Sequence, residues 1–124
     1  MSTESEPVRL TPQQHQILLA SRVGHLATTG QDGQPYVVPC CFAVSDGEIV
    51  TPIDEKPKTV PGRRLRRIRN LLENPRVSFV VDHFEEDWSK IGYLLILGQA
   101  TLIEPGRDRP AALAALRAKY RQYG

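Results

Sequence analysis

The order of apolar and polar positions in the first half of the chain predicts one helix and three short strands. Thr11 followed by Pro12 is typical of a helix start, because a threonine caps the first turn and proline fits its first position. The helix runs on through QQHQILLASR and ends near Ala20 and Ser21. Pro39 indicates an irregularity or an unpaired N–H position within the second strand. The three strands, separated by glycine-containing turns, are Val23–Thr29, Pro35–Val44 and Glu48–Ile53.

The second half of the chain predicts two helices and further strands. An amphipathic helix covers Arg63–Glu73 and ends at Asn74-Pro75. Strand Arg76–Asp82 follows, and an acidic loop over Phe84–Lys90 leads to Ile91–Glu104, a long strand or a strand pair bent at Gly98. The apolar positions of the Arg63–Glu73 helix are Leu65, Ile68, Leu71 and Leu72. A last helix begins at Arg109-Pro110, with an apolar stripe of Leu113, Leu116, Tyr120 and Tyr123.

This succession lacks the regular alternation of strands and helices that builds a parallel sheet. It predicts a mainly β protein with accessory helices (α+β), in the form of a small antiparallel barrel. A chain of 124 residues is long enough for a single core. We expect residues 1–10 to be a mobile N-terminal tail and residues 11–124 to form one domain.

Composition narrows the classes of function. With 40% hydrophobic and 24% charged residues and a net charge of +2, the chain is ordinary for a globular protein. Its charge therefore favours neither nucleic acid nor a membrane as partner. The two cysteines, Cys40 and Cys41, are neighbours that point to opposite faces of a strand, so they do not bond to each other easily. No spacing resembles a zinc site, and no apolar run suits a signal peptide or a membrane span. We expect a cytoplasmic protein without a metal.

Positive charge is concentrated in Asp54–Arg69, DEKPKTVPGRRLRRIR. Lys56, Lys58 and Thr59 offer ammonium and hydroxyl donors that suit a phosphate. A solvated surface loop explains the same residues equally well. The arginines that follow fit the wet face of an amphipathic helix better than a nucleic-acid contact, because no aromatic residues interleave them.

Elsewhere the chain offers no acid–base pair or nucleophile motif, so we predict no catalytic side chain and expect a bound anionic cofactor to bring the chemistry. Trp88, flanked by acidic residues, is the other notable position. A large aromatic residue in such a loop indicates an interface or a pocket wall, or else a cover for one end of the barrel.

Taken in order, these segments resemble the split-barrel flavin-binding proteins related to pyridoxamine 5′-phosphate oxidase, particularly the branch that uses the deazaflavin coenzyme F420. The stretch VGHLATTGQDGQPYVVPCCFAV is similar to the first hairpin of that family. The phosphate loop of that family, the helix after it and the next strand resemble EKPKT, the arginine-rich helix and ENPRVSFVVDHFEEDW of this chain. A later strand of the family resembles GQATLIE. The resemblance covers about Thr11 to Glu104 and implies a split antiparallel β-barrel of the FMN-binding type.

The resemblance also implies roles for individual residues. Lys56, Lys58 and Thr59, with Pro57 between them, would hold the cofactor phosphate. Trp88 would reach the site of a partner, because in this family the cofactor lies at a homodimer interface. The arginine helix would meet the glutamate tail of F420. The cofactor ring would lie along Val38, Pro39 and Cys40, with Ile53 and Asp54 at its edge.

The activity implied is an oxidoreductase that uses F420 to transfer hydride to a small electron-poor substrate. FMN in the same pocket, giving an oxidase or flavin reductase, is the alternative cofactor. Two further alternatives are a non-catalytic cofactor- or haem-binding protein on the same barrel and a nucleic-acid binder built on the arginine helix.

Overall fold

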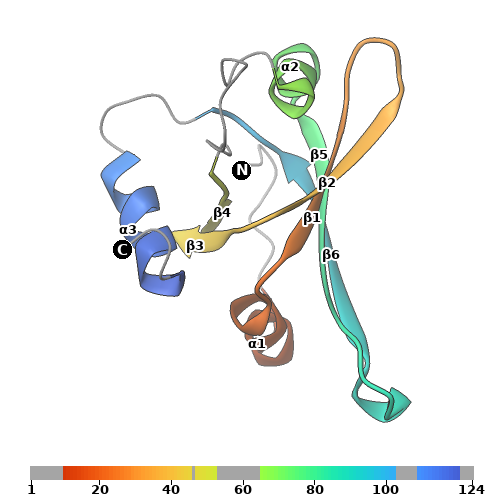
Figure 1. The fold of residues 1–124 in the computed structure, drawn as a ribbon, viewed down its shortest axis with the longest axis vertical. Coiled ribbons are helices and arrows are strands. Elements are labelled where there is room, and N and C mark those ends of the chain that lie inside the picture. Colours follow the sequence, from red (N-terminus) through yellow and green to blue (C-terminus); the bar gives the residue numbers. More distant parts are fainter. Residues whose placement is uncertain (1–9, 46, 53–64, 103–108, 121–124) are drawn as a thin grey trace.

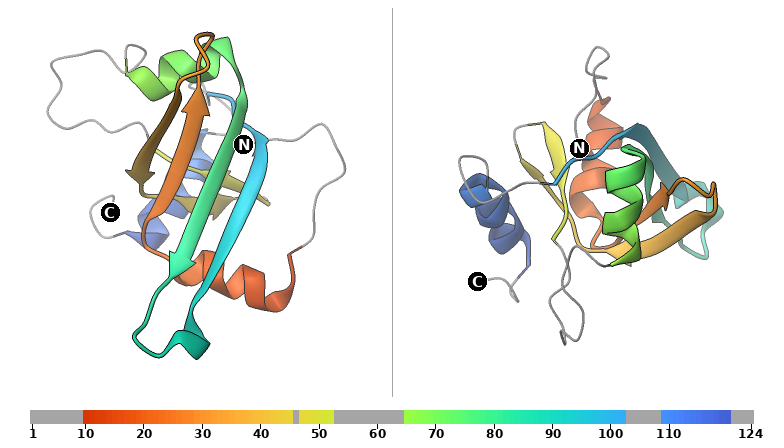
Figure 2. Two further views of the ribbon diagram at one scale, coloured as in Figure 1. Left: turned by 90° about the vertical axis from the view of Figure 1, so that its right-hand side faces the viewer. Right: turned by 90° about the horizontal axis from the view of Figure 1, so that it is seen from above.

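The computed structural model describes residues 10–45, 47–52, 65–102 and 109–120. Two antiparallel sheets make up the fold (Figure 1). The larger has the strand order β2 (Pro35–Cys40), β1 (Gly24–Thr29), β5 (Arg76–His83) and β6 (Gly92–Gln99), and the smaller pairs β3 (Ala43–Ser45) with β4 (Glu48–Val50). The α-helices of the described residues, α1 (Pro12–Ala20), α2 (Arg66–Glu73) and α3 (Arg109–Lys119), lie on one side of the larger sheet, and Figure 2 shows none of them on its other face. The mainly antiparallel architecture with accessory helices is as predicted.

Helix α1 (Pro12–Ala20) begins as the sequence predicts. The Thr11 hydroxyl accepts a hydrogen bond from the Gln14 backbone at 3.1 Å, and the Gln14 side chain accepts one from the Thr11 backbone at 2.9 Å. This reciprocal cap satisfies two backbone donors that a helix start leaves unpaired. Leu18 is the buried residue of the helix and joins the core under the larger sheet.

Strands β1 (Gly24–Thr29) and β2 (Pro35–Cys40) form the predicted first hairpin. Its turn ends at Gly33, which has a φ of 78° that glycine adopts without strain. Pro39 stays in register opposite His25, and since β2 is an edge strand its missing N–H costs no ladder bond.

The prediction of one strand over Pro35–Val44 is wrong. After β2 the chain crosses to the second sheet, where β3 (Ala43–Ser45) pairs with β4 (Glu48–Val50). The break falls at Phe42, whose backbone N–H donates to the hydroxyl of Tyr120 at 3.2 Å instead of to a neighbouring strand. Ile53, the predicted end of β4, lies outside the described residues.

Helix α2 (Arg66–Glu73) ends at Asn74 as predicted, but its face differs from the prediction. Leu65 is extended and caps the helix, and Leu72 is 59% exposed. Ile68 is buried as predicted and Leu71 packs against the larger core, but the polar Asn70 is buried as well. The hydrophobic pattern therefore predicted the helix correctly, but it wrongly assigned Leu72 to the buried face.

Strands β5 (Arg76–His83) and β6 (Gly92–Gln99) form a long hairpin. Gly98 pairs with Val77 inside the ladder, and β6 ends at Gln99, short of the predicted Glu104. Between the strands lies a short 3-10 helix, η2 (Trp88–Lys90). The larger core lies between this hairpin, β1 and the helices; its buried residues are Leu18, Leu26, Phe42, Val77, Phe79, Val81 and Leu94.

A second core joins helix α3 (Arg109–Lys119) to β3 and β4. Leu116 and Tyr120 are buried as the predicted stripe requires, and Ala112 joins them. The side chain of Leu113 and all of Tyr123 lie outside the described part. No helix within the described residues is long and apolar enough to cross a membrane.

Candidate cofactor site

Three predicted ring-lining residues lie along the last half of β2. Val38 is half-buried and packs on the larger core, while Pro39 is exposed. Cys40 is half-buried at the end of the strand, opposite Gly24. Gly24 has no room for a side chain, because a Cβ there would meet the ring of Phe79 at 2.1 Å. β1 and β2 thus present a firm, mostly apolar edge on which a planar ligand can lie.

The Cys40 thiol is a neutral contact at this edge. Burial raises its pKa, while a hydrogen bond with Thr51 and the positive charge of Arg67 act in the opposite direction. The Thr51 hydroxyl also donates to the carbonyl of Cys41 at 2.7 Å. Both cysteines are free, and they pack on different cores, Cys40 on the larger one and Cys41 on the one under α3.

The predicted phosphate loop lies outside the described residues, so the assignments of Ile53, Asp54, Lys56, Pro57, Lys58 and Thr59 stay predictions. The residues on either side of it are described. Thr51 is hydrogen-bonded at the end of β2, and Arg67, in the first turn of α2, acts electrostatically on Cys40. One flank of the segment 53–64 is therefore held at the Cys41 carbonyl by Thr51, and the other carries a positive charge that acts on Cys40.

Helix α2 is fixed to β1 by polar contacts that the sequence analysis missed. The side-chain amide of Asn70 donates to the Thr28 hydroxyl at 3.0 Å, and both residues are buried. The Glu73 carboxylate accepts from the Gln31 backbone at 2.8 Å. Gly30 allows this approach, since a Cβ there would lie 2.6 Å from the Glu73 carboxylate. Asparagine is a poor helix former. Its presence inside the helix, two residues after Ile68, was therefore the sequence signal for a specific polar contact.

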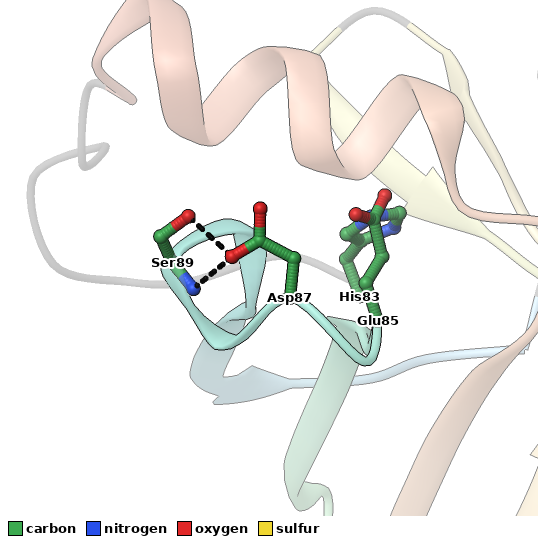
Figure 3. A network of polar contacts seen from close by, with 4 residues as sticks. All are labelled: His83, Glu85, Asp87 and Ser89. Atoms are coloured by element: carbon green, nitrogen blue, oxygen red, sulfur yellow. Dashed lines mark hydrogen bonds and ion pairs between the residues drawn. The ribbon is translucent and has the colours of Figure 1, made fainter.

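Trp88 begins the short 3-10 helix between β5 and β6. Figure 3 shows Asp87 and Ser89 of this loop, together with His83 and Glu85. The loop is ordered by Asp87, whose carboxylate accepts from the Ser89 backbone at 3.1 Å and from the Ser89 hydroxyl at 2.7 Å. These bonds lower the pKa of Asp87. Trp88 itself is 76% exposed, and it is not among the residues that line the groove between α1 and the β5–β6 loop.

The loop also holds a polar contact between His83 and Glu85. His83 lies beside Asp82 in sequence, but its Nε2 contacts the carboxylate of Glu85 at 2.7 Å. Both side chains are exposed to solvent, so the pair contributes little to stability. Within the described ranges, no group of three or more His, Cys, Asp and Glu could hold a metal ion.

The described part of the site fits a flavin-type cofactor in its donor set. β2 offers an apolar edge, Thr51 a hydroxyl, and Arg67 a guanidinium beside Cys40. These groups suit a planar ring carrying an anionic substituent. The thiol of Cys40, with its raised pKa, is a poor proton acceptor or nucleophile at neutral pH.

Comparison with known proteins identifies the family. The profile of the family described as pyridoxamine 5′-phosphate oxidase matches residues 10–124. The chain belongs to this family. The resemblance found in its sequence is thereby confirmed, and the match covers the hairpin, α2, the β5–β6 pair and α3.

A curated relative is the 5a,11a-dehydrotetracycline/5a,11a-dehydrooxytetracycline reductase of Streptomyces rimosus subsp. rimosus, 39% identical over 99 residues. The match covers 74% of this chain and 63% of the reductase, so the chain spans less than two thirds of that relative. Family and relative together support an oxidoreductase.

Solved structures share the fold. A conserved hypothetical protein from Mycobacterium tuberculosis has a TM-score of 0.75 at 24% identity, covering 97% of this chain and 69% of that one. A haem storage protein from Vibrio cholerae has a TM-score of 0.71 at 20% identity, covering 91% and 77%. A FAD-binding protein from Mesorhizobium loti is 30% identical, with a TM-score of 0.51 and coverage of 73% and 58%. The predicted split barrel is confirmed, and the comparisons point to flavin-type binding.

Proposed function

We propose that this protein is a homodimeric reductase that uses coenzyme F420 to transfer hydride to a small electron-poor organic substrate. The observation that carries the proposal is the relation to a reductase of dehydro compounds at 39% identity. Reduction of such a compound belongs to the reaction class proposed here. The arginine-rich start of α2 supports a cofactor with several negative charges, because F420 carries a glutamate tail in addition to its phosphate.

The chain's own residues would bind the cofactor, orient its ring and shield it from water. The edge formed by Val38 and Cys40 supports the ring face, and Lys56, Lys58 and Thr59 hold the phosphate. Arg67 adds positive charge beside the ring. When bound, the reduced deazaflavin supplies the hydride, so no side chain has to act as acid or base.

The outer face of the larger sheet supports the homodimer. The exposed fractions are 60% for Val37, 71% for Tyr93, 53% for Leu95 and 69% for Leu97. The strand register places three of these side chains on two adjacent rows, which are Val37, Ala27, Ser78, Leu97 and Pro39, His25, Val80, Leu95. Tyr93 follows on the next row, opposite Asp82. No helix covers this face in Figure 2. An apolar face of this kind is typical of an interface.

A second copy fits this face because its charges are self-complementary. Arg76 and Asp82 both lie on the outer face of β5, at opposite ends of the strand. A two-fold axis through the middle of β5 places Arg76 of each copy against Asp82 of the other, as an isologous interface requires. The apolar rows then pack together between the two charge pairs. Trp88 would extend from the hairpin tip toward the partner.

FMN is the second candidate cofactor, and the 30% identity to a FAD-binding protein favours it. FMN would occupy the same strand edge and phosphate loop, giving an oxidase or flavin reductase. The two cofactors differ in the tail, which only F420 carries. A preference for F420 therefore depends on cations beyond those that hold the phosphate.

Titration of the purified protein with F420 and FMN, followed by desalting and absorption spectroscopy, tests the proposal. We expect F420 to be retained and FMN to be lost. Reduced F420 should then be oxidised when an electron-poor alkene is added. Retention of FMN alone, with turnover of FMN and none of F420, would reverse the assignment, and retention of neither would reject it.

A further inference from the structure

Two cations share one aromatic ring where α3 meets the start of β1. The guanidinium carbon of Arg22 lies 4.7 Å from the centre of the Tyr120 ring. The Lys119 Nζ lies 5.5 Å from the same centre and 3.5 Å from the centre of the Phe42 ring. The Tyr120 hydroxyl donates to the Arg22 carbonyl at 2.9 Å and accepts from the Phe42 backbone, which fixes the ring. A buried scaffold thus sets the positions of both cations.

Neither cation has an acidic partner among the described residues. Burial lowers the pKa of Lys119, and the charge of Arg22 lowers it further. The faces of Phe42 and Tyr120 attract the two cations but do not neutralise them. Because their like charges repel each other, both cations are stabilised by an anion that comes close to them.

The pair lies next to the candidate cofactor site and next to open space. The Lys119 Nζ lies over the ring of Phe42, which follows Cys40 at the end of β2 by two residues. Arg22 lines a groove of about 720 Å³ between α1 and the β5–β6 loop. The polar lining residues besides Arg22 are Gln13, Gln16, Ser21, Asp82, His83 and Ser89, so that one carboxylate, Asp82, shares the groove with Arg22. A ligand in either place can therefore bring an acidic group to the pair.

We propose that Arg22 and Lys119 form an anion-binding subsite for a carboxylate or phosphate group of a small-molecule ligand. It is separate from the predicted phosphate loop, which lies within Asp54–Arg69. The acidic group has two sources, the glutamate tail of F420 or an acid on a separate ligand in the groove. Only the first source rests on the proposed function.

Local binding is tested without any cofactor. The pKa of Lys119 is followed by NMR of ¹³C-labelled lysine while glutarate or inorganic phosphate is added. An anion stabilises the protonated amine, so the pKa should rise and saturate. Arg22→Gln keeps the carbonyl that Tyr120 contacts and should weaken probe binding about threefold to tenfold. Arg117→Gln removes the same charge from an exposed position on α3 and should leave binding unchanged. An unchanged Lys119 pKa, or equal losses in the two variants, would overturn the subsite.

The source is tested with the cofactors. If the tail of F420 supplies the acid, Arg22→Gln should weaken F420 about threefold to tenfold and leave FMN unchanged. If a separate ligand supplies it, both cofactors should bind normally while glutarate binding weakens. If the protein binds no F420 at all, the proposed function fails, and the glutarate titration still tests the subsite. Insensitivity of glutarate, phosphate and F420 alike to Arg22→Gln would reject the subsite.

Discussion

The contact between Asn70 and Thr28 gives a quantitative prediction about how α2 is held. Asn70→Ala removes a buried hydrogen bond and leaves the Thr28 hydroxyl, 1% exposed, without that donor. An unsatisfied buried group costs about 1–3 kcal/mol. Alanine is the better helix former and returns up to about 0.7 kcal/mol. We expect the free energy of unfolding to fall by about 1–2.5 kcal/mol.

Urea denaturation at a fixed protein concentration measures this loss, since a dimer makes stability depend on concentration. Thr28→Val should cost a similar amount by stranding the Asn70 amide. The double variant should be less destabilised than the sum by about 1 kcal/mol, because both changes break one bond. Arg69→Ala, exposed on the same helix, should change stability by less than about 0.5 kcal/mol. Additive losses at Asn70 and Thr28, or an Asn70→Ala protein as stable as the parent, would refute the reasoning.

Three further predictions concern the loop, the second core and the interface. Lys58→Ala should weaken F420 binding at least about tenfold, whereas Arg69→Ala should change it little; equal, negligible effects in a fluorescence titration would show that the loop is only surface. Tyr120→Phe should lower the free energy of unfolding by about 1–3 kcal/mol in urea, because the buried N–H that donates to its hydroxyl loses its partner. Arg76→Glu and Asp82→Arg should each weaken the dimer in analytical ultracentrifugation, and the double variant should restore it; no recovery in the double variant argues against the two-fold pairing.

Local signals in the sequence were enough for the elements that depend on nearby residues. Thr11, Pro12 and Gln14 make the cap of α1 within four positions, and a glycine ends the first hairpin turn. The family match shows that the order of such elements also carried the fold. Each of these features is decided by residues close together in the chain, so a reading of local patterns finds them.

Contacts between distant residues were out of reach of the same reasoning. The chain changes sheets at Phe42 because its N–H meets Tyr120, 78 positions later. The buried face of α2 contains Asn70 and not Leu72 because Thr28, 42 positions earlier, offers a hydrogen bond there. Hydrophobic periodicity ranks Asn70 and Leu72 by hydrophobicity alone, so it predicted that Leu72 would be buried. At the site, the sequence pointed to β2, and the structure added Arg67 and Thr51 beside Cys40.

The candidate site lies at the seam between the two cores, and this position couples it to residues that never touch a ligand. Cys40 packs on the larger core and Cys41 on the smaller one, so the peptide between them bridges the seam. Side-chain hydrogen bonds tie the seam on both sides, from Thr51 to the Cys41 carbonyl and from the Phe42 backbone to Tyr120. A change that shifts α3 against the sheet must therefore move the end of β2, where the cofactor ring is predicted to lie. We therefore expect Tyr120→Phe to weaken cofactor binding as well as to lower the free energy of unfolding.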